Sequence, residues 1–353
     1  MAGHWLAELD GSRVTVEVPA SSANLGAGYD CLGLALAMVD RIEVEVRVWS
    51  RGEIELTVEG EGRNELAEDR DNRFVQGLEA TLRAARGDLP DGVGWRISMH
   101  NAIPLARGLG SSAAATVGGI LAGNALAGEA LSMPEMLAIA CDIEGHPDNA
   151  AAALLGGFVV SARHPGGVEA IRFDSPRDLR AILFVPELRL PTDEMRAALP
   201  ATVPLADAVA NLGAVAVGVA GLATGRYDLL AQLTVDRLHE PYRAAVYPHL
   251  PAMVEAARGA GALGACLSGA GSTILAFVDS MAGITRIEAA YFAAAADLDL
   301  AGRVVVVEPR NTGASVLSPG RPPTLRYSAA RRRPRDRPGR GRPPPRSRRP
   351  RCG

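Results

Sequence analysis

Residues 104–115, PLARGLGSSAAA, have the types and spacing that could hold a phosphate group. Gly108 and Gly110 let the backbone turn sharply and approach a ligand without interference from a Cβ atom. Ser111 and Ser112 add hydroxyls that can cap a helix or reach a phosphate oxygen or its Mg²⁺ ion. The surrounding pattern predicts a strand before this stretch and a helix from Ser111 onward. Unpaired amide groups and the positive end of the helix dipole would therefore attract an anion.

Two common phosphate-binding loops are excluded by the same residues. A Walker A loop needs a lysine after its glycines, and the chain contains no lysine. The dinucleotide pattern G-x-G-x-x-G has Ala113 at its third glycine position here, after a strand and loop of the wrong length. The alternative to an anion site is a tight, capped turn made of glycine and serine. On this stretch alone both interpretations stay open.

The elements that would position this loop follow from hydrophobic periodicity. Residues 19–36 are predicted as a loop that leads into an apolar segment. Strands that alternate apolar with charged residues are predicted around it, at 13–18, 41–48, 53–59 and 94–101. Helices are predicted over 72–86, 111–126 and 132–144, the last with Ser132 as its N-cap.

The second half of the chain adds a further group of strands and helices. The predicted order is a hairpin from 156–162 and 168–173, a strand at 179–186, a mainly helical region over 206–260, a glycine-rich turn and strand over 264–279, a helix over 281–296 and a strand at 303–309. Because strands and helices are grouped rather than strictly alternating, the predicted fold class is α+β. The predicted domains are residues 1–157, residues 158–317 and a disordered tail rich in arginine and proline, 318–353.

Composition and cysteine spacing indicate a globular protein of the cytoplasm. The chain has 353 residues, of which 48% are hydrophobic and 22% charged, as is ordinary for a globular protein. No run of 18 uninterrupted apolar residues occurs, so no membrane partner is expected, and acids near the N-terminus argue against a secretory signal. The cysteines have no CxxC spacing, which favours buried free thiols over disulfides or a zinc site. They are Cys31, Cys141, Cys266 and Cys352.

The C-terminal stretch 328–353 is strongly basic. It holds eleven arginines and one aspartate, a charge of +10, while the rest of the chain carries −13. A basic tail can bind nucleic acid, but this one has no aromatic residue for base stacking, and its prolines keep it extended. It is therefore predicted to be a disordered extension, and no specific nucleic acid partner is expected.

Three stretches together resemble the GHMP kinases, a family named after galacto-, homoserine, mevalonate and phosphomevalonate kinases. They are 19–36 (PASSANLGAGYDCLGLAL), 104–114 (P-x-x-x-G-L-G-S-S-A-A) and 267–277 (LSGAGSTILAF), in the order and spacing of that family. The resemblance implies a two-lobed fold with mixed or antiparallel sheets packed against helices. It also implies an ATP-binding loop made of Pro104, Leu105, Ala106, Arg107, Gly108, Leu109, Gly110, Ser111, Ser112, Ala113 and Ala114. Backbone amides and a helix dipole, instead of a lysine, would then bind the triphosphate.

Within the family, the flanking residues are most similar to the members that phosphorylate homoserine in threonine biosynthesis. The similar segments are 19–36, 143–157, 191–200 and 239–251. The resemblance implies that Ser112 and Glu144 hold Mg²⁺, and that the chain forms a homodimer. It also implies that the amino-acid substrate is bound by Asn24, Asp30, His146, Thr192, Arg196 and Arg243.

These residue types suit L-homoserine, which presents a carboxylate, an ammonium group and a hydroxyl. Arginine offers a fixed fork for a carboxylate, so Arg196 and Arg243 could hold that end. Asp30 could pair with the ammonium, and Asn24 offers both donors and an acceptor. Taken singly, each residue has a plain structural alternative: a surface arginine, a turn aspartate or a loop histidine.

The implied reaction transfers the γ-phosphoryl group of ATP to the substrate hydroxyl, with Asn149, Asp148 and Arg243 as candidate catalytic residues. Several relatives use an aspartate as base where this sequence has Asn149. An amide cannot usefully accept a proton near pH 7, so no dedicated protein base is expected, with Asp148 as the alternative. Two rival functions remain: a kinase of the same family acting on mevalonate or a sugar, and a non-catalytic sensor of ATP or another anion.

Overall fold

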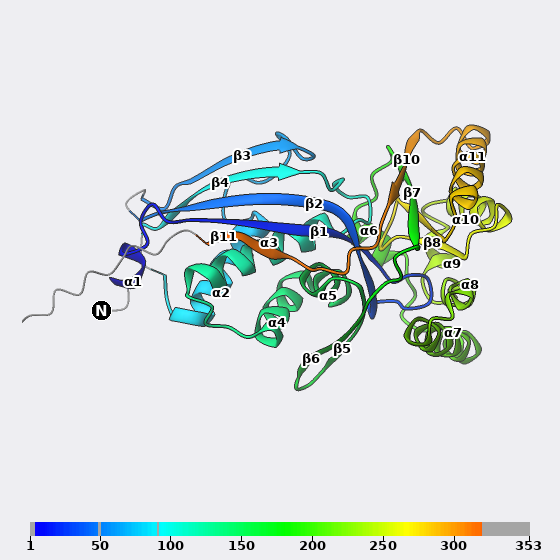
Figure 1. Cartoon of the computed structure of the whole chain (residues 1–353), viewed down its shortest axis with the longest axis horizontal. Coiled ribbons are helices and arrows are strands. Elements are labelled where there is room, and N and C mark those ends of the chain that lie inside the picture. Colours follow the sequence, from blue (N-terminus) through cyan, green and yellow to red (C-terminus); the bar gives the residue numbers. More distant parts are fainter. Residues whose placement is uncertain (1–3, 49–50, 90–91, 320–353) are drawn as a thin grey trace, which may run out of the picture. The chain divides into compact units, whose positions relative to one another are not determined.

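The computed structural model describes residues 4–48, 51–89 and 92–319. Cys352 and the part of the predicted tail beyond Pro319 lie outside the described residues. A short helix, α1 (His4–Ala7), precedes two β-sheets and their covering helices (Figure 1).

The first sheet has seven strands and is mixed. Its strands are β1 (Arg13–Ala23), β2 (Leu32–Arg47), β3 (Ile54–Gly60), β4 (Gly94–Asn101), β5 (Phe158–His164), β6 (Gly167–Phe173) and β11 (Ser315–Pro319). The order is β11-β1-β2-β4-β3, while β5 pairs with the start of β2 and β6 pairs with β5. Only β3 and β4 run parallel among these pairs.

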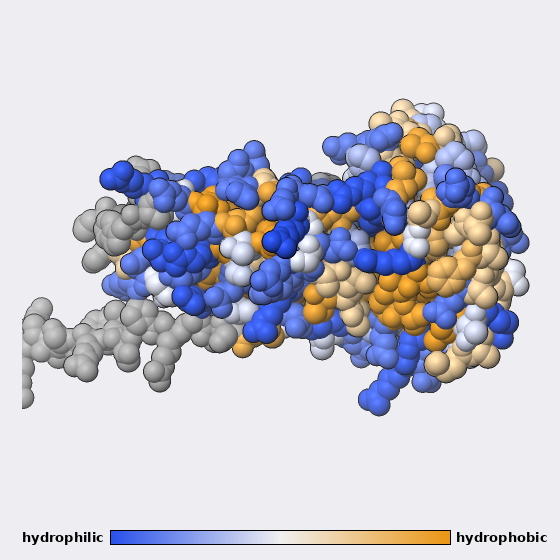
Figure 2. All heavy atoms as spheres, turned by 90° about the horizontal axis from the view of Figure 1, so that it is seen from above, coloured by the Kyte–Doolittle hydropathy of each residue, from blue (hydrophilic) through white to orange (hydrophobic). Residues whose placement is uncertain are grey.

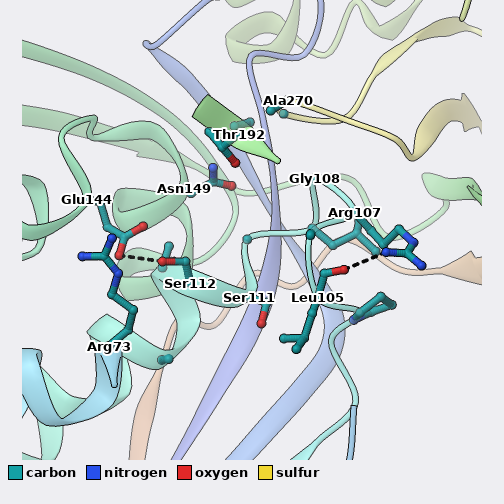
Figure 3. Close-up of a pocket in the computed structure, with 18 of the residues that line it drawn as sticks. Arg73, Leu105, Arg107, Gly108, Ser111, Ser112, Glu144, Asn149, Thr192 and Ala270 are labelled. Atoms are coloured by element: carbon teal, nitrogen blue, oxygen red, sulfur yellow. Dashed lines mark hydrogen bonds between the residues drawn. The ribbon is translucent and has the colours of Figure 1, made fainter. Parts of the chain in front are cut away.

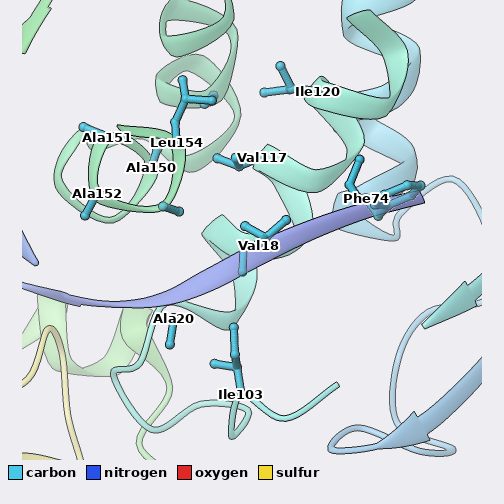
Figure 4. Packing of buried hydrophobic residues seen from close by; sticks show 14 of the residues in the cluster. Val18, Ala20, Phe74, Ile103, Val117, Ile120, Ala150, Ala151, Ala152 and Leu154 are labelled. Atoms are coloured by element: carbon cyan, nitrogen blue, oxygen red, sulfur yellow. The ribbon is translucent and has the colours of Figure 1, made fainter. Parts of the chain in front are cut away.

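Four helices cover one face of the first sheet (Figure 1). They are α2 (Arg73–Arg86), α3 (Ser111–Leu126), α4 (Met133–Glu144) and α5 (Asp148–Leu155). The core between them and β1 is built from small and branched aliphatic side chains, such as Val18, Val117 and Ala151 (Figure 4). Gly119 lets α2 and α3 approach closely, because a Cβ atom there would lie 2.0 Å from the carbonyl oxygen of Phe74.

The second sheet is antiparallel and has its own hydrophobic core. It contains β7 (Arg180–Pro186), β8 (Gly264–Leu267), β9 (Ile274–Val278) and β10 (Gly302–Val307) in the order β10-β7-β9-β8. The helices α10 (Leu250–Gly259) and α11 (Met281–Asp297) pack against it. Between β7 and α10 lie α6 (Thr192–Ala197), α7 (Leu205–Thr224), the 3-10 turn η1 (Tyr227–Leu229), α8 (Leu230–Leu233) and α9 (Glu240–Arg243).

The predicted α+β class with mixed and antiparallel sheets is confirmed. Strand β1 differs from its prediction, because it continues to Ala23 and leaves a loop only over 24–31. Ser21 and Ser22, which read as loop residues, are fully buried in the strand. The amide of Ser21 donates to the carbonyl of Leu109, at 3.0 Å. A strand covered on both faces need not alternate polar and apolar residues, so the pattern could not mark it.

Several further elements and one thiol differ from the sequence prediction. The helices α1, α5 and α6 and the strands β8 and β11 had not been predicted as separate elements, and β11 includes residues 318 and 319, which had been predicted as the start of the disordered tail. The hairpin β5–β6 and the helices α2, α3 and α4 lie where predicted. Cys141 and Cys266 are buried free thiols as predicted, whereas Cys31 is only half-buried. The division after residue 157 stays a prediction, and β5, β6 and β11 pair within the first sheet.

Helix α7 exposes an unusual amount of apolar surface. By length and composition it is the one described helix that could cross a membrane, and 17% of its apolar window is buried. A single such helix is weak evidence for a membrane span. Its exposed side chains include Leu205, Val209, Leu212 and Val217. Seen from above, hydrophobic surface also gathers at the end of the molecule that carries the second sheet (Figure 2).

Candidate active site

A cleft of about 470 Å³ brings the predicted site residues together. All of them line it except Ala114, which is fully buried in α3. The lining contains residues 104–113, Asn24, Asp30, Glu144, His146, Asp148, Asn149, Thr192, Arg196 and Arg243. The loop after β4, the start of α5 and the helices α6 and α9 thus meet at one cleft, although they are distant in sequence. Figure 3 shows the loop together with Asn149 of α5 and Thr192 of α6.

The glycines of the phosphate-loop candidate are required by the protein itself. Gly108 and Gly110 have φ angles of 73° and 72°, a conformation that favours glycine. A Cβ atom would lie 2.0 Å from the Ser268 carbonyl oxygen at the first position, and 2.1 Å from Ser21 Oγ at the second. Gly110 is also the N-cap of α3 and provides no side chain to cap it. The start of α3 therefore faces the cleft with amide groups that no capping side chain covers.

Ser112 and Glu144 converge at the start of α3, where Mg²⁺ was predicted. Ser112 Oγ donates to Glu144 Oε1 at 3.0 Å (Figure 3). Thr116 Oγ1 donates to the same oxygen at 2.6 Å. No group of three or more histidines, cysteines or acids that could hold a metal occurs among the described residues. Mg²⁺ commonly uses one or two carboxylates together with substrate phosphates. One carboxylate and one hydroxyl beside residues 104–114, the predicted phosphate loop, fit that ion.

Asp148 and Asn149 begin helix α5 at the floor of the cleft. Asp148 is 2% exposed, and its Oδ1 accepts a hydrogen bond from the Asn149 amide at 2.7 Å. His146 Nδ1 lies 2.9 Å from the same oxygen and donates to it. Burial alone would lower the pKa of His146, but the hydrogen bond to Asp148 and the negative charge of that carboxylate together outweigh it and raise the pKa above its usual value. Asn149 Oδ1 accepts a hydrogen bond from Ser21 Oγ at 2.9 Å.

Arg196 and Asp30 form a two-pronged ion pair in the lining of the cleft. The Arg196 Nη atoms donate to the two Asp30 carboxylate oxygens at 2.7 and 3.1 Å. Nη1 also donates to the Tyr29 hydroxyl at 2.8 Å. The hydrogen bond to Asp30 raises the pKa of Arg196. The pair joins the loop after β1 to helix α6, and both of its residues line the cleft.

Arg243 is buried, with 1% of its surface exposed, yet it lines the cleft. Its Nη1 donates to the Gly269 carbonyl at 2.9 Å and to His239 Nδ1 at 3.0 Å. His239 Nε2 lies 2.8 Å from the Gly26 carbonyl and must donate to it, so Nδ1 is the acceptor. Burial lowers the pKa of His239, which keeps this ring neutral beside the guanidinium.

Tyr29 lies between the two arginines and was missed by sequence reasoning. Its ring centroid is 5.5 Å from the Arg243 guanidinium carbon and 5.6 Å from that of Arg196. Both distances are within the range of a cation–π interaction. The adjacent Asp30 was the available signal, because Tyr29 precedes it directly in the same loop.

The glycine-rich turn 268–273 holds both halves of the site. Ser268 Oγ donates to the carbonyl of Gly108 at 2.7 Å, and Asn24 Nδ2 donates to the carbonyl of Gly269 at 2.9 Å. The preceding strand is held by half-buried Glu240, which accepts a hydrogen bond from the amide of Leu267 at 2.7 Å. Burial raises the pKa of Glu240 to about 8.

Other cleft residues had no sequence signal, because they come singly from separate elements. Asp40 accepts hydrogen bonds from the amides of Ala102 and Ile103 at 2.7 and 3.0 Å, so it holds the chain where it enters the phosphate loop. Burial raises the pKa of Asp40 to about 6. The remaining unpredicted lining includes Ile42, Leu66, Ala67, Asp71, Asn72, Arg73, Met99, Asn101, Asp193 and Ala270.

Two family models match parts of the chain. Residues 72–157 match the family model described as GHMP kinases N terminal domain, and residues 219–296 match the one described as GHMP kinases C terminal. The chain is 39% identical over 313 residues to a homoserine kinase of Caldicellulosiruptor bescii, covering 86% of this chain and 97% of that protein. It is 42% identical over 263 residues to a homoserine kinase of Moorella thermoacetica, covering 74% and 86%.

The fold of the chain is also similar to that of a solved homoserine kinase. The crystal structure of homoserine kinase from Cytophaga hutchinsonii superimposes with a TM-score of 0.77 at 29% sequence identity. The match covers 87% of this chain and 98% of that chain.

Proposed function

The chain belongs to the homoserine kinases of the GHMP kinase family, and we propose that it transfers the γ-phosphoryl group of ATP to the hydroxyl of L-homoserine. The observation that carries this proposal is that one cleft is lined by all the groups the reaction would need. It places a phosphate loop and a carboxylate–hydroxyl pair beside two arginines and an aspartate suited to an amino acid. The product would be O-phospho-L-homoserine, formed in the cytoplasm.

On the nucleotide side, the amide groups at the start of α3 would bind the phosphates through hydrogen bonds and the helix dipole. Ser112 and Glu144 would hold Mg²⁺, which when bound neutralises charge on the phosphates. Residues 104–113 would surround the triphosphate. Because the reaction needs positioning more than covalent chemistry, a loop that holds the triphosphate in place would supply much of what the transfer requires.

On the amino-acid side, the pair of Asp30 and Arg196 is complementary to a zwitterion. A bound homoserine can offer its ammonium to Asp30 and its carboxylate to Arg196, so each charge of the pair keeps an opposite partner. Arg243 would hold the carboxylate from the buried side. Asn24, His146 and Thr192 complete the pocket wall.

The direct test is a substrate panel. Purified protein with ATP and Mg²⁺ should release ADP with L-homoserine and yield a phosphate ester at its hydroxyl, visible by phosphorus NMR. Mevalonate, galactose and L-serine serve as comparison acceptors. Faster turnover with mevalonate or the sugar, or ATP binding without turnover on any acceptor, would overturn the proposal.

We infer that no side chain acts as a dedicated base and that Asn149 orients the substrate hydroxyl. Asn149→Ala should slow turnover by about a hundredfold, the usual effect of losing one positioned polar group in a site. Asn149→Asp should not gain activity or a new acidic limb in its pH–rate profile. The alternative is Asp148, whose Oδ1 is already shared by His146 and the Asn149 amide.

The pH–rate profiles of Asn149→Asp and Asp148→Asn decide between these readings. A slower Asp148→Asn enzyme with an unchanged profile would show that Asp148 only positions His146. If Asp148→Asn alone abolished turnover and erased an acidic limb, Asp148 would be the base.

We also propose that the chain forms a homodimer through α7. The exposed face of this helix holds Leu205, Val209 and Leu212, and Asp207 is the one charged residue in the helix. Apolar surface of this kind marks interaction sites. Light scattering without detergent should give the mass of two chains. The mass of one chain, or recovery only in detergent, would contradict the proposal.

A further inference from the structure

Arg107 is the one basic residue of the ATP-loop candidate, residues 104–114. In a chain without lysine, its position invites the assumption that it takes the place of a phosphate-binding lysine. The contacts of its side chain point to a different role.

Each of the three guanidinium nitrogens donates to a backbone carbonyl. Nε donates to Pro186 at 2.7 Å, Nη2 donates to Glu187 at 2.7 Å, and Nη1 donates to Leu105 at 3.0 Å. Pro186 is the last residue of β7. The side chain therefore joins the loop after β4, in the first sheet, to a strand end of the second sheet.

The direction of the side chain agrees with these bonds. In Figure 3, Arg107 extends away from Ser111 and Ser112, and its guanidinium lies on the opposite side of the loop from the Ser112–Glu144 pair. The N–H groups of its guanidinium thus point away from the part of the cleft where the phosphates would bind.

The backbone around Arg107 is held from another direction by the turn 268–273. The amide of Thr273 donates to the carbonyl of Arg107 at 3.1 Å, and Ser268 Oγ donates to the carbonyl of Gly108 at 2.7 Å. The packing is so close that a Cβ atom on Gly108 would lie 2.0 Å from the Ser268 carbonyl oxygen. With the Arg107 side chain, this turn fixes the loop on two sides.

We propose that Arg107 is a positioning residue, which ties the ATP loop to the end of β7 and does not itself contact phosphate. The proposal rests on the proposed function for the ligand of the loop, but the tie exists in the ligand-free protein. A loop held in its binding conformation loses less freedom when the nucleotide arrives, so the tie raises affinity without a direct contact. The planar guanidinium suits this task, because it carries several donors in a fixed geometry.

Two variants separate positioning from phosphate contact. Arg107→Ala removes the tie and the charge, whereas Arg107→Lys keeps the charge but cannot reproduce three bonds in a planar fork. For a positioning role, both variants should raise the Michaelis constant for ATP about tenfold or more, in line with the loss of charged hydrogen bonds. The Michaelis constant for homoserine should stay near that of the parent.

Hydrogen exchange in the absence of ATP gives a readout that a phosphate contact would not move. Peptides covering 104–112 and the residues after β7 should exchange faster in both variants than in the parent. Peptides from α10 and α11 should be unchanged, which excludes general destabilisation. Because this measurement needs no turnover, it tests the tie even if the proposed substrate is wrong.

The matched control is Arg189→Ala, which removes a positive charge near Arg107. Arg189 is half exposed, forms an ion pair with Glu65 and does not line the cleft. The Arg189→Ala variant should leave ATP binding and the hydrogen exchange of peptides covering 104–112 unchanged. The proposal is overturned if Arg107→Lys keeps the parent affinity for ATP while Arg107→Ala loses it with unaltered loop exchange. It is also overturned if both Arg107 variants behave like the parent.

Discussion

Replacing Arg243 by alanine is expected to weaken homoserine binding by roughly thirty- to several-thousand-fold. This corresponds to the cost of about 2–5 kcal/mol for removing one partner of a desolvated charge pair. Arg243 is 1% exposed and lines the cleft, so a substrate carboxylate that pairs with it would lose most of its water. The Michaelis constant for ATP should change little, because the ATP loop belongs to a different part of the cleft. Isothermal titration with homoserine, alongside steady-state kinetics, measures both.

Three comparisons make the Arg243 result specific. Arg243→Lys should recover only part of the loss, because a point charge cannot make two parallel hydrogen bonds to a carboxylate. Arg237→Ala is the matched control, since that side chain is 55% exposed and pairs with Asp207 at the surface. Retained ATP binding by Arg243→Ala shows that the protein still folds.

A change of substrate tests the same contact from the other side. Homoserine methyl ester lacks the carboxylate and should be a poor substrate for the parent enzyme. Arg243→Ala should discriminate far less between the ester and homoserine. If the parent phosphorylated the ester as well as homoserine, neither Arg196 nor Arg243 could hold the carboxylate.

The variant Glu144→Gln is expected to lower turnover by at least about a hundredfold, since even indirect supports of a metal site cost ten- to a hundredfold. Its amide oxygen can still accept from Ser112 and Thr116, which donate to Glu144 at 3.0 and 2.6 Å. Packing should therefore survive while the negative charge is lost. The Mg²⁺ concentration needed for half-maximal turnover should rise together with the fall in rate.

The control for this change lies on the same helix. Asp142→Asn removes one carboxylate from α4 at a side chain that is 72% exposed and pairs with Arg163. It should leave the Mg²⁺ dependence as it is in the parent. An unchanged Mg²⁺ dependence in Glu144→Gln as well would mean that Glu144 serves only to hold Ser112 and Thr116 in place.

Local pattern was enough to predict most helices and strands and the glycine–serine loop of the cleft. The alternation in β2 and β4, the capping residues of α4 and the periodicity of α2 each arise from interactions between near neighbours in sequence. The glycine–serine loop was visible because positive φ angles and a helix start leave a mark on residue type. The resemblance to a known family then supplied the distant residues, such as Arg196 and Arg243, which no local pattern marks.

The sequence by itself therefore determined a set of residues that, apart from Ala114, line the cleft. Only the tertiary structure decided what each of them contacts. Asp30 and Arg196 were predicted separately, and the structure pairs them; Gly108 was expected to make room for a ligand, and it also makes room for Ser268. Arg107 carries the only positive charge of its loop, yet all three of its partners are carbonyl groups, and two of these lie about eighty residues away. Such contacts depend on how the two sheets pack together. Hydrogen bonds between distant segments produce no periodicity, spacing or bias in composition, so they cannot be predicted from the sequence.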